Sequence, residues 1–138
     1  MTEQVRHAGN GLAVDPNGRE IVVSLNEKEG VRLVRVTHQD GSAKEIPLPK
    51  NLRPSYLALG GNALSPSGKL LFSIASPDSA FFAPAILNLK SGGATRIPLN
   101  YTGDIFNMAW AQDGRVLASG EELVSHLWRF RPVEGDGH

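Results

Sequence analysis

The four histidines come first in a search for chemistry, because histidine titrates near neutral pH and is a common metal ligand. They are His7, His38, His126 and His138, and no two have the His-x-x-x-His spacing of a metal pair. The sequence has no cysteine, no Gly-x-Ser-x-Gly nucleophile elbow and no glycine-rich phosphate loop ending in Lys-Ser/Thr. We therefore predict no catalytic residue, no metal ligand and no cofactor.

The composition indicates one globular domain spanning residues 1–138. Apolar residues make up 41% of the chain and charged residues 20%. Lys+Arg 14 balances Asp+Glu 14, and such a neutral chain is a poor nucleic-acid binder. No run approaches the ~20 apolar residues of a membrane span. The first residues, "MTEQVRHAGNG", lack the apolar core of a signal peptide, so we expect a cytoplasmic protein without membrane contacts.

The sequence contains three copies of one unit, aligned on Gly18, Gly68 and Gly114, which are 50 and 46 residues apart. An alanine stands five residues before each glycine, a large apolar residue four before and a basic residue one after. The residues three after the glycines are also apolar: Ile21, Leu71 and Leu117. This agreement predicts a repeat architecture with units at about 8–49, 58–100 and 104–132.

Each unit divides into short strands separated by turn signals. In the first unit, "GLAVD" leads through "PNG" into "REIVVSL", and "VRLVRV" and "KEIPL" follow after further turns. Branched residues between Gly, Pro and Asp clusters favour strands, and nothing has a sustained helical period. We predict an all-β fold of four-stranded antiparallel blades, in which Pro-x-Gly is the tight turn between the first and second strands.

The stretches "LAVDPNG" and "ALSPSG" resemble the Ala-x-Ser-Pro-Asp-Gly turn of WD-repeat and TolB-like propellers. The stretch "LWRF" (127–130) stands where WD repeats have their Trp-Asp pair, with Arg129 replacing the aspartate. The resemblance covers nearly the whole chain and implies a β-propeller fold.

The third unit has only three expected strands, "FNMAWA", "RVLASG" and "HLWRF", whereas residues 2–6 align with the fourth strands of the other units. This permuted order predicts that the N-terminal strand completes the last blade. Propellers need ~4–8 blades, so three blades cannot surround an axis. We favour a six-bladed homodimer in which each N-terminal strand completes the partner's last blade. The alternative is that the chain is part of a larger propeller.

Binding residues are expected on the long loops, because variable loops on a rigid scaffold carry most binding sites. The first-to-second and third-to-fourth turns are short and lie at one end of each blade, while the long connections lie at the other. Aromatic, basic and acidic residues on those connections are our candidate site: Arg53, Tyr56, Asp78, Phe81, Phe82, Tyr101 and Asp104. The structural alternative is that Phe81 and Phe82 fill the core or a seam, and that Asp78 and Asp104 are turn residues.

The function that we expect is a binding or scaffold module for a protein or another ligand, rather than an enzyme, and a protein segment, a peptide or a sugar are all open as its partner. The alternative is a lactonase-like hydrolase with a divalent metal in the central channel. Asn10, Asn62 and Asn107 lie near the axial ends of first strands, but stand eight, six and seven residues before the aligned glycines. Since side chains alternate along a strand, these three are not equivalent positions.

Trp110 and Trp128 occupy packing columns of the repeat. We predict that both are core residues that seal one blade against the next, with their indole N–H groups bonded to backbone carbonyls. The functional alternative is that Trp110 stacks on a ligand near the axis.

Overall fold

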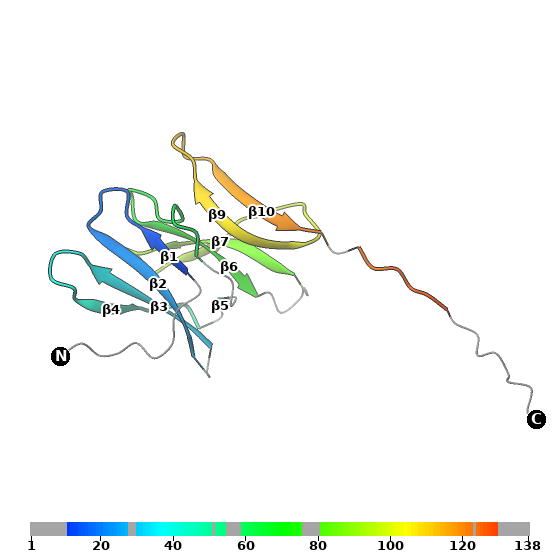
Figure 1. Cartoon of the computed structure of the whole chain (residues 1–138), viewed down its shortest axis with the longest axis horizontal. Helices are drawn as coiled ribbons and strands as arrows, with labels where there is room; N and C mark the ends of the chain where they lie inside the picture. The colour runs from blue at the N-terminus through cyan, green and yellow to red at the C-terminus, as the bar shows by residue number, and fades with distance from the viewer. Residues whose placement is uncertain are drawn as a thin grey trace, which may run out of the picture.

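The computed structural model describes residues 11–27, 30–50, 52–54, 59–75, 81–122 and 124–129. Its strands form three antiparallel sheets, and the described residues contain no helix (Figure 1). It follows that these ranges hold no helix long and apolar enough to span a membrane. The predicted all-β class is confirmed.

Sheet A is a meander of four strands in chain order: β1 (Gly11–Val14), β2 (Glu20–Glu27), β3 (Gly30–Thr37) and β4 (Ala43–Ile46). The alternation predicted from "EIVVSL" is present in β2, where Val22 and Ser24 are buried and the residues between them are half-exposed. One face of this sheet therefore packs on the rest of the protein, which is the usual reason for a period of two.

Sheet B has the same order: β5 (Arg53–Pro54), β6 (Lys69–Ala75), β7 (Phe82–Asn88) and β8 (Ala94–Arg96). All five central residues of β6 are buried, so this strand is covered on both faces. The expected first strand "NALS" (62–65) does not form a continuous strand, and two separate segments pair with β6 in its place. Residue Leu64 forms an isolated bridge with Leu70, while β5 pairs with the far end of β6.

Sheet C has two strands, β9 (Asp104–Trp110) and β10 (Val116–Glu121). The predicted third strand "HLWRF" is wrong for this structure, because residues 124–129 form no strand. In Figure 1 this segment continues away from the sheets. Trp128 is 76% exposed, so its assignment to the core is also wrong. The predicted strand 2–6 lies outside the described residues.

The three turns that the repeated glycines predict are confirmed. Gly18, Gly68 and Gly114 have φ angles of 68°, 80° and 81°, which only glycine adopts without strain. Each glycine N–H donates to the carbonyl oxygen three residues earlier, at 2.8–3.0 Å.

The strand register corrects the alignment by one residue. Ile21 pairs with Val14, and Leu70 and Val116 pair in the same way with Leu64 and Trp110. Ile21 therefore corresponds to Leu70 and Val116, not to Leu71 and Leu117, because the first turn is one residue longer than the other two.

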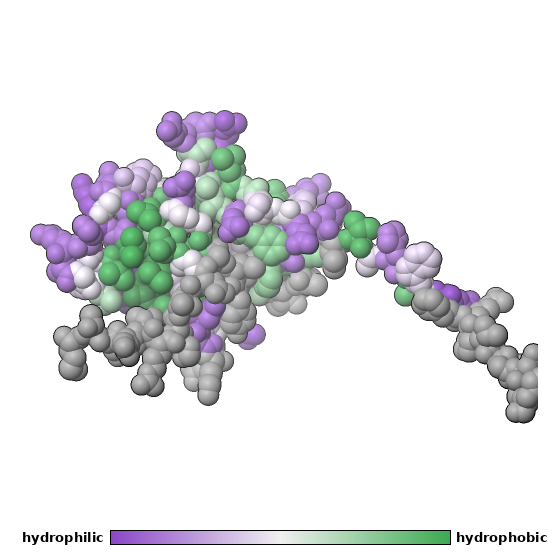
Figure 2. Space-filling view, viewed as in Figure 1, coloured by the Kyte–Doolittle hydropathy of each residue, from purple (hydrophilic) through white to green (hydrophobic). Residues whose placement is uncertain are grey.

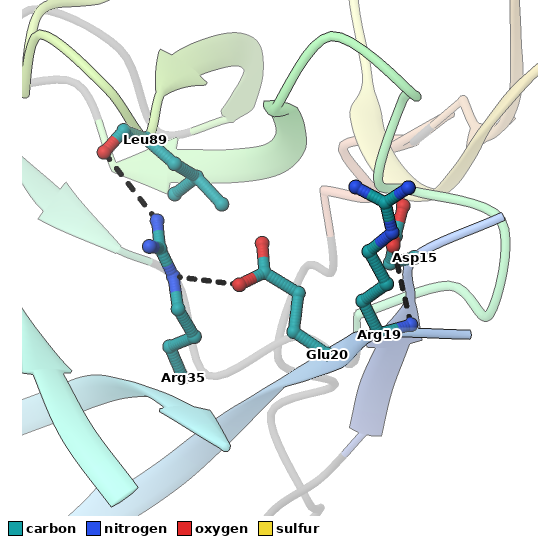
Figure 3. A network of polar contacts seen from close by, with 5 residues as sticks. All are labelled: Asp15, Arg19, Glu20, Arg35 and Leu89. Atoms are coloured by element: carbon teal, nitrogen blue, oxygen red, sulfur yellow. Dashed lines mark hydrogen bonds and ion pairs between the residues drawn. The ribbon is translucent and has the colours of Figure 1, made fainter. Parts of the chain in front are cut away.

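Sheet B lies between sheets A and C. Strands β6 and β7 contact β9, and β3 contacts β5. Buried residues from all three sheets form one hydrophobic cluster. A polar contact also crosses between sheets A and B. The Arg35 guanidinium on β3 pairs within its own sheet with Glu20 Oε2 at 3.3 Å, and its Nη2 donates to the Leu89 carbonyl beyond β7 of sheet B at 3.4 Å (Figure 3). The sheets therefore form a stack in the order A, B, C.

Candidate functional site

Short turns lie at one end of the stack and long connections begin at the other, as the sequence predicts. At one end, the His38 N–H donates to the Arg19 carbonyl and the Leu89 N–H donates to the Gly68 carbonyl, both at 2.9 Å. These bonds bring the short turns of each sheet together. The longer connections, which follow β4, β6 and β8, begin at the opposite end, and this loop end contains a large hollow.

The hollow is a groove of about 830 Å³ between sheets A and B. It is bounded by the start of β3, the end of β4, the connection from β4 to β5 and the facing ends of β6 and β7. The apolar residues on its walls include Ile46, Leu48, Leu52, Ala75 and Phe82. Such a volume matches the ~300–1,000 Å³ of typical ligand pockets.

Basic side chains line the edge of this groove. Arg32 forms ion pairs with Glu27 at 3.1 Å and with Glu45 at 3.7 Å. Lys50 and Arg53 are exposed, and neither has an ion-pair partner among the residues that the structure describes. The groove therefore combines apolar walls with two cationic groups that are open to a ligand.

Two of the predicted site residues, Arg53 and Phe82, line this groove. Phe81, Phe82 and Tyr101 line a smaller hollow of about 50 Å³ on the other side of β7. Phe82 thus borders both hollows, whereas Arg53 lines only the groove and Phe81 and Tyr101 line only the smaller hollow. Tyr56 and Asp78 lie outside the described residues.

Asp104 has a structural contact. Its Oδ1 accepts a hydrogen bond of 2.7 Å from the backbone N–H of Phe82, which joins β9 in sheet C to β7 in sheet B. Asp104 is the first residue of β9 rather than a turn residue. We infer that its carboxylate holds two sheets together, and this leaves one of its oxygens for other contacts.

Tyr101 packs across two glycines. A Cβ atom at Gly103 would lie 2.8 Å from Tyr101 Cε1, and one at Gly120 would lie 2.9 Å from the same atom. The ring therefore covers backbone at the start of sheet C, and at 39% exposure it keeps a solvent-facing edge. This contact gives Tyr101 a packing role in addition to the solvent-facing edge.

The residues that sequence reasoning missed at the groove are Arg32, Glu45, Leu48, Lys50 and Leu52. Arg32 stood in a strand pattern, and nothing local shows which neighbouring sheet its strand will face. Leu48, Lys50 and Leu52 belong to the connection after β4, where alternating apolar and basic residues in "LPKNLR" were the available signal.

The residues of the alternative metal site are only partly brought together. Asn62 and Asn107 line one hollow of about 400 Å³ beside Gly60 and Gly61, while Asn10 lies outside the described residues. The Asn62 carbonyl accepts the Trp110 backbone N–H at 2.9 Å. Within the described ranges, no three His, Cys, Asp or Glu residues are grouped as metal ligands would be.

No family model matches the chain, and no curated protein matches it in sequence.

Proposed function

We propose that the three sheets are blades of a β-propeller and that the chain is a binding module with its ligand site in the groove at the loop end. The face-to-face stack and the three equivalent Gly turns support the blade architecture. Three blades are half of a six-bladed ring, so in this proposal two copies of the chain build one ring.

The groove selects a ligand with an apolar group and a carboxylate. Leu48, Leu52 and Phe82 would remove the apolar group from water, which contributes roughly 25 cal/mol per Å² of buried apolar surface. Lys50 and Arg53 would pair with the acid. A peptide with an acidic residue beside a large apolar one has this chemistry, and it is the partner class that we propose.

The observation that carries this proposal is the pair of unpartnered cations beside an apolar wall. In many surface clusters each charge already has an opposite neighbour, as Arg32 has in Glu27 and Glu45. Because Lys50 and Arg53 have none among the described residues, a bound anion would not have to displace an existing ion pair.

The test uses two small probes that share a phenylalkyl group and carry head groups of opposite charge. Phenylpropionate and the matched phenylpropylamine are titrated into isotope-labelled protein, and backbone amide shifts are followed by NMR. We expect phenylpropionate to shift the amides of Val31, Leu48 and Phe82, and phenylpropylamine to leave them unchanged. Equal shifts with both probes, or shifts confined to the turn end, would contradict the proposal.

A pair of variants checks the role of the cations. Lys50→Ala combined with Arg53→Ala should weaken phenylpropionate binding about fivefold or more, since each exposed ion pair is worth up to about 1 kcal/mol. Lys90→Ala is the matched control, because Lys90 is equally a surface lysine but lies at the turn end of sheet B. Loss of binding in the control would indicate a general charge effect.

A further inference from the structure

Each sheet of the stack has two faces, and the face that carries Val22 in sheet A is turned toward sheet B. Arg35 pairs with Val22 across β2 and β3, so both side chains lie on the same face. The Arg35 guanidinium reaches the Leu89 carbonyl of sheet B at 3.4 Å. Val22 is completely buried. We call this the forward face of a sheet.

Sheet B turns its own forward face toward sheet C. Ser73 lies on the same face of β6 as Leu71, and its hydroxyl donates to the Ile105 carbonyl of β9 at 2.7 Å. The opposite, rear face of sheet C carries Trp110, and the Trp110 indole N–H donates to the Lys69 carbonyl of β6 at 3.1 Å. Forward and rear faces therefore meet twice within the chain, between A and B and between B and C.

The forward face of sheet C has no sheet against it in the described part of the chain. Leu117 pairs with Ala109 as Val22 pairs with Ala13, and the Leu71 N–H bonds to the Ala63 carbonyl. Leu117 therefore holds the position of Val22 and Leu71. Those two are 0% and 1% exposed, whereas Leu117 is 60% exposed.

The rear face of sheet A is open in the same way at the other end of the stack. In sheet B, the corresponding residues Leu64 and Leu70 are 1% and 0% exposed. In sheet A itself, Leu12 and Val14 are 46% and 40% exposed. Figure 2 shows a hydrophobic area over this sheet. The register places six aliphatic residues on its rear face: Leu12, Val14, Ile21, Val23, Val34 and Val36.

We propose that the forward face of sheet C docks on the rear face of sheet A of a second copy, and that the same contact is made in the other direction. The argument for a second copy is that this pair of face types already packs twice inside each chain. The inference adds the contact surfaces to the proposed propeller architecture and is independent of the groove. Two reciprocal contacts around a two-fold axis close a ring, whereas one contact alone would build an open fibre.

The mass of the protein in solution tests this proposal first. Light scattering at micromolar concentration should give the mass of two copies. Leu117→Lys should weaken association about 30-fold or more, because docking would bury an unpaired charge. Leu99→Lys is the matched control: Leu99 is 55% exposed but lies in the connection between β8 and β9, on neither docking face. A single-copy mass for the unchanged protein would overturn the proposal.

Cross-linking tests which faces meet, and the absence of native cysteine makes it direct. Copies with Leu117→Cys are mixed with copies with Val14→Cys and treated with a short bismaleimide. We expect cross-linked pairs in the mixture only. Pairs formed by either variant alone would show like faces in contact and contradict the proposal. Copies with Ser42→Cys, at an exposed turn of sheet A, are the control and should not link to either.

A further measurement separates this proposal from the groove. If residues 1–10 of the same chain cover one of the faces, the protein would be a single copy. Leu117→Lys or Val14→Lys would then lower its melting temperature, and the docking proposal would fail.

The groove is tested separately, because phenylpropionate binding should survive in the Leu117→Lys variant. If two copies associate but the protein does not bind phenylpropionate, only the proposed ligand site in the groove is rejected.

Discussion

The Trp110 indole N–H donates a hydrogen bond of 3.1 Å to the backbone carbonyl of Lys69, across the boundary between sheets C and B. The backbone N–H of the same tryptophan donates to the Asn62 carbonyl at 2.9 Å. The side chain is half-buried and packs against the hydrophobic cluster. The indole bond to a backbone carbonyl and the contact between two sheets are as predicted, whereas the assignment of Trp110 to the core is wrong because its side chain is only partly buried.

Trp110→Phe should reduce the free energy of unfolding by about 1 kcal/mol, because the phenyl ring retains most of the packing but cannot donate the hydrogen bond. Urea denaturation of the variant measures this loss. Trp128→Phe is the control and should leave stability unchanged. Phenylpropionate binding should persist in both variants. Unchanged stability together with lost binding would support the alternative in which Trp110 contacts a ligand.

The two tryptophans should also differ in fluorescence. Trp128 is 76% exposed, so the Trp110→Phe variant, which keeps only Trp128, should emit at the longer wavelength. Iodide should quench it more strongly than it quenches the Trp128→Phe variant, which keeps only the half-buried Trp110. The opposite order would show that Trp128 is covered in solution.

The parts of the fold that could be predicted from sequence depend on neighbouring residues. Gly18, Gly68 and Gly114 require a positive φ at a turn, and each turn joins strands that then pair directly. The order of strands in sheets A and B followed from these turns. Even so, the extra residue in the Pro-Asn-Gly turn shifted the alignment by one position, because spacing alone does not show where a loop accommodates an insertion.

The parts that could not be predicted depend on distant surfaces. The composition of "HLWRF" suits a strand, but pairing needs a partner edge, and Trp128 pairs with no strand among the residues that the structure describes. The groove is built by β3, the connection after β4 and the ends of β6 and β7, which come together only when sheets A and B stack. Phe82 was identified by its residue type, whereas the role of Lys50 became clear only when the structure placed it with Arg53 on the lining of the groove.

Asp104→Ala should destabilise the protein by about 1.5–3 kcal/mol, because it leaves the Phe82 N–H without its charged acceptor. Asp104→Asn keeps an oxygen acceptor and should cost clearly less. Asp113→Ala is a surface control, since that carboxylate contacts Arg115 in an exposed turn. Thermal and urea unfolding measure all three. Equal effects of Asp104→Ala and Asp104→Asn would show that the hydrogen bond contributes little.

Asp40 should titrate below the usual aspartate range. The backbone N–H of Ser42 donates to Asp40 Oδ1 at 2.9 Å, and this bond, with a smaller contribution from the Ser42 hydroxyl, lowers the pKa of the carboxyl. Because the folded pKa is lowered, the stabilisation is present above the unfolded pKa and is lost as the pH falls through the folded value. NMR titration of the carboxyl measures it.

Ser42→Ala is the informative variant for this turn, because it removes the hydroxyl but retains the backbone N–H. The pKa of Asp40 should remain lowered in the variant, by less than in the unchanged protein. A return to the ordinary value would mean that the hydroxyl, and not the backbone N–H, is the main cause.

Gly60 and Gly61 are adjacent, but only at Gly60 would a side chain meet another sheet. A Cβ atom at Gly60 would stand 2.6 Å from the carbonyl oxygen of Met108 on β9, whereas one at Gly61 would meet nothing within 4 Å. Gly60→Ala must therefore push sheet C away from sheet B, because the obstructing atom is backbone and cannot rotate aside. We expect a loss of about 2 kcal/mol or more in the free energy of unfolding.

Gly61→Ala is the matched control for this close approach. Both substitutions restrict the unfolded chain equally, which by itself stabilises a protein by about 0.4–1 kcal/mol. Gly61→Ala should therefore be neutral or slightly stabilising, and urea denaturation of the two variants isolates the effect of the contact. If both variants unfold at the same urea concentration, the backbone of Gly60 does not approach Met108 as closely as the structure places it. A difference between them would instead establish that sheets B and C are packed with no room for a methyl group at this point.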